Sequence, residues 1–192
     1  MQIAVIGWGS LISSPGVLRL QSRWHRDGPS LPVEFARISG GNRLTLVIHS
    51  ASRNQQTLWA GAALDDLSQV RENLRQREGT QLRLIHTASA DGVFSDGVAE
   101  SVKESVSAWL RQKPHLFGCV WTGLPSNWEK ERNCIYSPAD AVRYLRGLDD
   151  PACARDYVQT APRQIQTEAR DAIRAQLGWQ DAELPDILFE NM

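Results

Sequence analysis

The chain has 192 residues, 42% of them hydrophobic, and its 21 basic and 22 acidic side chains leave a formal net charge of −1. This composition is that of an ordinary globular domain and argues against extensive disorder. The balanced charge lacks the basic excess of a nucleic-acid-binding protein. No apolar stretch approaches the roughly 18 residues of a membrane span, so neither nucleic acid nor a membrane is an expected partner.

The cysteines are too few and too widely spaced for a stabilising framework. Cys119, Cys134 and Cys153 form an odd set without a C-x-x-C pair. Neither a disulfide framework nor a zinc site is therefore expected, and we predict no bound metal. Unpaired cysteines are typical of a reduced, cytoplasmic protein.

Residues 1–90 are mainly strand-like. A short buried strand is expected over Gln2–Ile6, and Val33–Ile38 with Arg43–His49 should form a hairpin. The connection Ser39–Asn42 supplies glycine and asparagine, which tolerate positive φ. Further strands are predicted at Thr57–Leu64, Gln81–His86 and Phe117–Thr122.

Residues 98–178 are mainly helical. Apolar residues recur there, and in one earlier segment, at the spacing of a helix face. The expected helices contain Leu67, Val70 and Leu74 before Gly79; Val98, Val102, Val106 and Leu110; a segment from the cap Ser137-Pro138 to Gly147; and Ile165, Ala169, Ile173 and Leu177 before Gly178. These elements predict an α+β protein with a largely antiparallel sheet that closes into a small barrel with flanking helices.

A glycine loop follows the first strand: Gly7, Trp8, Gly9, Ser10 and Leu11. Glycine lets a backbone turn sharply and lets a ligand approach its N–H groups. Successive N–H groups in such a turn can bind an anion. The loop is therefore either a simple strand-ending turn or a site for a carboxylate or similar small anion.

A dinucleotide-binding loop is a poorer interpretation of the same residues. The third glycine of that motif is missing, Pro15 and Gly16 interrupt the helix that should follow, and no βαβ unit is predicted. Ser10 does not lie in the G-x-S-x-G frame of a nucleophile elbow. Arg37 and Arg43 flank the hairpin turn, where they could bind a substrate carboxylate or remain solvated.

Glu78 extends the apolar face of the helix that starts near Leu67. At about 100° per residue, Glu78 falls about 20° from Leu67, whereas Glu72 falls about 140° away. Burial and the negative end of the helix dipole both disfavour a charged carboxylate at this position, which suits a general base near neutral pH. The alternative is that the helix frays and Glu78 points into water beside an arginine.

Three segments together resemble the gamma-glutamylcyclotransferase family. Ile3–Leu11 is similar to the family's first strand and its Tyr-Gly-Ser loop, and Val33–Ser39 with Arg43–Val47 to its next two strands. Leu74–Gly79 resembles the family's helix that ends in the catalytic Glu-Gly pair. The resemblance implies a barrel domain over residues 1–125 and a C-terminal helical extension, 126–192, packed on the same domain.

The resemblance also implies a reaction. Glu78 would act as general acid and base, and the loop Gly7–Leu11 would hold a gamma-glutamyl substrate. The α-amine would attack the γ-carbonyl, releasing 5-oxoproline and an amine or amino acid without a metal or cofactor. Such a protein would be a cytoplasmic monomer or homodimer.

The sequence departs from the family pattern at two places. Trp8 stands where the family has tyrosine, and Gln81–Thr87 holds no match to the family's pocket tyrosines. A non-catalytic small-molecule-binding domain on the same fold is the main alternative, followed by an unrelated hydrolase or an interaction protein built on the C-terminal helices. A buried Glu78 that faces residues 7–11 would favour the enzyme.

Overall fold

The computed structural model describes residues 2–190, so the first residue of the predicted barrel domain and the last two of the extension lie outside the described residues. The strands are β1 (Gln2–Gly7), β2 (Ser30–Ser39), β3 (Arg43–Ile48), β4 (Asn54–Gln56), β5 (Leu58–Gly61), β6 (Ile85–Ser89) and β7 (Leu116–Thr122). The helices are α1 (Ser10–Ser13), α2 (Leu67–Glu78), α3 (Glu100–Arg111), α4 (Trp128–Arg132), α5 (Pro138–Arg146), α6 (Ala152–Thr160) and α7 (Glu168–Leu177). The predicted α+β class is confirmed.

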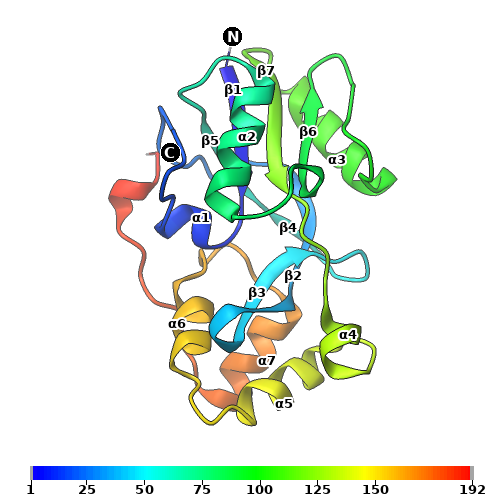
Figure 1. The fold of residues 1–192 in the computed structure, drawn as a ribbon. Coiled ribbons are helices and arrows are strands. Elements are labelled where there is room, and N and C mark those ends of the chain that lie inside the picture. Colours follow the sequence, from blue (N-terminus) through cyan, green and yellow to red (C-terminus); the bar gives the residue numbers. More distant parts are fainter. Residues whose placement is uncertain (1, 191–192) are drawn as a thin grey trace.

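The first sheet has four strands in the order β5-β1-β7-β6. Its central strand β1 runs antiparallel to β5 and parallel to β7, and β7 runs antiparallel to β6. The apolar run Ile3–Ile6 is fully buried, as expected for a strand with neighbours on both edges and cover on both faces. Helix α2 packs on β7, β6 and β1 (Figure 1).

The second sheet has three antiparallel strands in the order β3-β2-β4. Strands β2 and β3 form the predicted hairpin, and Gly41 (φ 72°) and Asn42 (φ 57°) supply the positive φ angles of its turn. The C-terminal helices gather on this sheet: α6 packs on β3, α4 and α7 pack on β2, and α5 packs on α7 (Figure 1). The C-terminal extension therefore packs on strands that come from the first half of the chain.

The predicted closed barrel is wrong: within residues 2–190 the strands form two separate sheets. Closure needs a free strand edge, and the outer edge of β5 is already occupied. His25 and Trp59 exchange backbone hydrogen bonds of 2.7 and 3.1 Å there, and Gln21 N–H donates to the Gly61 carbonyl at 2.8 Å. The predicted antiparallel character is confirmed, since β1–β7 is the one parallel pair among the described strands.

The helix signals were more accurate than the strand signals. Helix α2 ends at Glu78 with Gly79 in the left-handed conformation (φ 59°), and α5 begins after the Ser137 cap, both as predicted. The strand expected at Gln81–His86 starts only at Ile85, because Leu82–Leu84 forms a 3₁₀ turn. Arg71 of α2 donates to the carbonyls of Leu82 and Ile85, so a helix side chain replaces a strand partner there. Strand β5 is shorter than predicted, and α1, β4, α4 and α6 were not predicted.

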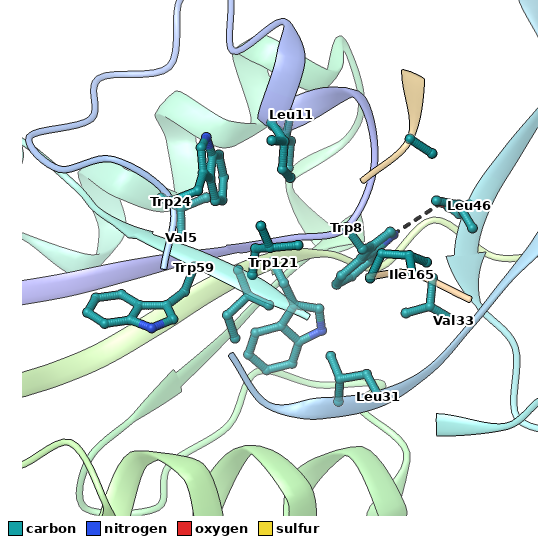
Figure 2. Close-up of a cluster of buried hydrophobic side chains, with 14 of the residues drawn as sticks. Val5, Trp8, Leu11, Trp24, Leu31, Val33, Leu46, Trp59, Trp121 and Ile165 are labelled. Atoms are coloured by element: carbon teal, nitrogen blue, oxygen red, sulfur yellow. Dashed lines mark hydrogen bonds between the residues drawn. The ribbon is translucent and has the colours of Figure 1, made fainter. Parts of the chain in front are cut away.

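Trp8 lies where the two sheets approach each other. Its ring lies beside Val33, Leu46 and Ile165 in one buried cluster (Figure 2). Ile165 precedes α7, so the cluster joins the first strand, the hairpin and the C-terminal region. Within residues 2–190, no helix has the length and apolar character needed to cross a membrane.

Candidate active site

A cavity of about 550 Å³ opens beside Trp8. Five segments line it: the glycine loop after β1, the β2–β3 hairpin, the end of α2, the end of β7, and α6. Its polar lining residues include Ser10, Arg37, Ser39, Arg43, Thr45, Arg77, Glu78, Thr122, Asp156, Tyr157 and Thr160. The two sheets and the C-terminal helices therefore meet at one concave site.

The glycine loop presents unused backbone donors. Gly9 caps the one-turn helix α1, and its carbonyl accepts from Ile12 N–H at 3.0 Å. Within residues 2–190 the N–H groups of Gly9, Ser10 and Leu11 make no hydrogen bond. This is expected at the start of a helix, where the first amides have no intrahelical acceptor. All three residues line the cavity.

The other two loop residues have mainly structural contacts. Trp8 lines the cavity, but its indole Nε1–H donates to the Leu46 carbonyl at 3.3 Å and its side chain is buried. Gly7 does not line the cavity. It belongs to β1, and a Cβ there would come within 3.0 Å of both Ile12 and Trp24. Gly7 is therefore a packing position, and Trp8 is a wall without a free polar atom.

Glu78 lies on the predicted face of α2. Its side chain is 13% exposed and lines the same cavity as Gly9, Ser10 and Leu11. Glu72, on the same helix, is 43% exposed and pairs with Arg75. The alternative in which the helix frays is excluded, because α2 is regular through Glu78 and Gly79 closes it.

Arg77 connects Glu78 with the loop. Its Nη1 lies 2.5 Å from Glu78 Oε1, and its Nη2 donates to Ser10 Oγ at 3.1 Å and to the Ser14 carbonyl at 2.8 Å. The guanidinium is itself only 14% exposed. One side chain therefore sets both the start of α1 and the position of the carboxylate.

Tyr157 is a site residue that the sequence did not reveal. It enters the cavity from α6, and its hydroxyl oxygen accepts from Leu46 N–H at 3.4 Å. Burial raises its pKa above the usual 10.0, and the negative charge of Glu78 raises it further, so the hydroxyl keeps its proton at neutral pH. The unpredicted helix α6 has no side-chain cap, and only the spacing of Ala154 and Val158 hinted at it.

Two more arginines line the cavity from the hairpin. Arg37 Nη1 donates to the Pro125 carbonyl at 2.7 Å, and Arg43 Nε donates to the Gly40 carbonyl at 2.9 Å. Within residues 2–190 neither side chain pairs with a carboxylate. With Arg77 they outnumber the acidic lining residues Glu78 and Asp156.

Within residues 2–190, no group of three or more His, Cys, Asp or Glu side chains is arranged to hold a metal ion. A scan against protein-family profiles, a search of curated proteins and a search of solved structures each returned no match. What the protein does is therefore inferred from the cavity and from the residues that line it.

Proposed function

We propose that the protein is an enzyme of the gamma-glutamylcyclotransferase type. The observation that carries the proposal is the shared cavity. Glu78, whose side chain is shielded, lines it together with Gly9, Ser10 and Leu11, whose N–H groups make no hydrogen bond within residues 2–190. A general base and an anion-binding backbone are the two parts that cyclisation of a gamma-glutamyl group needs.

In the proposed reaction the loop N–H groups bind the α-carboxylate of the substrate. Glu78 takes a proton from the α-ammonium, and the free amine attacks the γ-carbonyl carbon to form a new C–N bond. Glu78 gives this proton to the amide nitrogen, and the old C–N bond breaks. The second proton that the ring nitrogen must lose also passes to the departing nitrogen, so the amine leaves as an ammonium. The products are 5-oxoproline and an amine or amino acid. The attack is intramolecular, so holding the glutamyl side chain of the substrate in the bent conformation that brings the amine to the γ-carbonyl supplies much of the acceleration.

The charge of the lining supports an anionic substrate. The lining contains three arginines and two acidic residues, which leaves a positive excess. Arg37 and Arg43 line the cavity from the hairpin, and each guanidinium keeps N–H donors that make no hydrogen bond within residues 2–190. They are available to a second carboxylate, such as that of a leaving amino acid.

One observation favours the non-catalytic alternative. The Arg77 guanidinium lies 2.5 Å from Glu78 Oε1 and already occupies this carboxylate oxygen. In an enzyme, the substrate ammonium must compete with Arg77 for this carboxylate, while Arg77 keeps its bonds to Ser10 and Ser14. In a binding domain, the Arg77–Glu78 pair would simply remain intact.

The decisive experiment measures 5-oxoproline release from a panel of gamma-glutamyl amino acids, gamma-glutamylamines and glutathione. The proteins compared are the wild type, Glu78→Gln, and Glu72→Gln as a matched control on the exposed side of α2. We expect release by the wild type and by Glu72→Gln, with a loss of at least about 100-fold in Glu78→Gln. Binding without release by the wild type would favour the non-catalytic alternative.

A further inference from the structure

Helix α6 brings a phenol hydroxyl against the glycine loop. A Cβ built on Gly9 would lie 2.7 Å from Tyr157 Oη, so the hydroxyl occupies the space next to this glycine. The ring stands edge-on to Phe35 with 6.3 Å between centroids, and Leu46 N–H holds the oxygen. The hydroxyl is thus fixed beside the backbone that presents the free N–H groups.

The hydrogen-bonding capacity of this hydroxyl is only half used. Its oxygen accepts one bond, but its proton has no acceptor within residues 2–190. Tyr157 is partly buried and lines the cavity, so this proton is available to an acceptor bound there. Trp8, the neighbouring aromatic residue, cannot take this role because its N–H is bonded to the Leu46 carbonyl.

We propose that Tyr157 is a substrate-binding residue: its hydroxyl donates to the carboxylate that the loop holds at Gly9. The inference rests on the proposed function for the identity of the ligand. It means that the C-terminal extension completes the site, since residues 2–125 contribute the loop and Glu78 but not this donor. Phenol and amide donors would then meet on one anionic group, and hydrogen bonds to an ionised acceptor are stronger than those between neutral groups.

A purely structural role is the rival explanation. In that case the hydroxyl only satisfies Leu46 N–H, and its removal would lower stability without changing ligand affinity. Tyr144→Phe is the matched control, because the Tyr144 hydroxyl donates to the Asn42 carbonyl at 3.0 Å and Tyr144 does not line the cavity. Both variants remove one hydroxyl from the C-terminal region and keep the ring.

The test uses the full chain and two readouts. Isothermal titration measures the Kd for gamma-L-glutamyl-L-alanine in the non-consuming Glu78→Gln background and for 5-oxo-L-proline in the wild-type background. We expect Tyr157→Phe to weaken binding of both probes about tenfold or more, with Tyr144→Phe unchanged. In turnover, the same loss should appear in KM more than in kcat, because the bond forms with a group that does not react.

The outcomes separate the two proposals. Unchanged affinity in Tyr157→Phe overturns the role of Tyr157, even if the wild type releases 5-oxoproline. Weakened affinity without any release supports Tyr157 as a ligand contact and contradicts the proposed reaction. Binding of neither probe to any of the proteins overturns the role of Tyr157. An equal loss of affinity in Tyr144→Phe and Tyr157→Phe also overturns it, since the effect would then be structural.

Discussion

Two parts of the molecule are stabilised in different ways: the first half is the four-stranded sheet with α2, and the second half is the three-stranded sheet with the C-terminal helices α4–α7. In the four-stranded sheet, β1 has backbone partners on both edges, and its residues Ile3–Ile6 are fully buried. The three-stranded sheet is instead covered by α4, α6 and α7, which are short and are joined by irregular segments. Both parts bury apolar residues on paired strands, and the second part also depends on side-chain bonds to the backbone.

Arg170 is the centre of the second half. Its side chain is fully buried, and it donates to the carbonyls of Val158, Ala161, Pro162 and Ile165 and to the carboxylate of Asp181. A residue of α7 thereby satisfies the end of α6 and the segment that follows it. A buried polar network of this kind specifies one arrangement, but it is costly to break.

The candidate site lies where these two halves meet. The glycine loop and Glu78 come from the half with the four-stranded sheet, whereas Arg43 and Tyr157 come from the other. Helix α6, which brings Tyr157 into the cavity, is held at its C-terminal end by the Arg170 network, although Arg170 does not line the cavity. We expect three changes to show how the two parts differ and where they are coupled.

Removing the Arg170 guanidinium should strongly destabilise the second half. We expect Arg170→Met to lower the free energy of unfolding by about 3–5 kcal/mol, because four carbonyls lose a donor in a buried place and Asp181 keeps only Arg174 as a partner. Urea unfolding measures the change. Arg163→Met is the control: Arg163 is 54% exposed and pairs with Glu183, so its loss should cost less than about 1 kcal/mol. Similar losses in both variants would contradict this view of the extension.

The contact between Gly9 and Tyr157 should appear as coupling between the two halves. Gly9→Ala should destabilise by about 1–3 kcal/mol, because the new Cβ would meet Tyr157 Oη at 2.7 Å. The cost should be smaller in a Tyr157→Phe background, since the ring carbon Cζ is 3.7 Å from that Cβ, an ordinary contact. A double-mutant cycle by urea unfolding measures the coupling, and additive effects would mean that the two residues do not touch. Gly9→Val should in addition abolish binding of 5-oxo-L-proline.

The smallest expected effect is a dependence of thermal stability on pH, and it comes from His49 in the second half and His86 in the first. Burial lowers the pKa of His49, and burial with the nearby Arg71 charge lowers that of His86, from the usual 6.5. Because the folded pKa of each histidine lies below 6.5, the unfolded chain binds more protons than the folded one as the pH falls through 6.5. Stability is therefore fully present above that pH and is lost as the pH falls through 6.5 towards each folded pKa. We expect the Tm to fall by about 2–4 °C between about pH 7 and about pH 5.

Scanning calorimetry at several pH values measures this dependence. His49→Gln and His86→Gln should each flatten it, and His115→Gln controls for loss of a histidine elsewhere. A pH profile that stays the same in the double variant His49→Gln/His86→Gln would assign the dependence to other groups.

Local signals in the sequence predicted the regular elements well. The stripe Leu67–Val70–Leu74 with Gly79, and the cap Ser137, both correspond to helices with nearly the expected ends. The same arithmetic placed Glu78 on the inner face of α2, where its side chain is now found to be shielded. These features depend on neighbours within a few residues, so a sequence pattern can encode them. The resemblance to the gamma-glutamylcyclotransferase family stays a prediction.

Other features had no such signal. The barrel prediction failed because the segment around His25, which has no strand pattern, occupies the edge of β5. Helix α6 was missed because it has no cap and its apolar spacing is short. Tyr157 was therefore missed as well, and neither the pairing of Arg77 with Glu78 nor that of Trp8 with Leu46 follows from spacing.

The sequence alone was enough to place α2 and α5, the glycine that ends α2 and the face of α2 that carries Glu78. Periodicity, capping and glycine conformation act over one or two turns of chain. Only the tertiary structure decided that a loop after the first strand, a carboxylate about 70 residues later and a tyrosine from the C-terminal region share one cavity. Such a meeting depends on long-range packing and on buried groups such as Arg170 finding partners, and spacing along the chain does not encode these contacts.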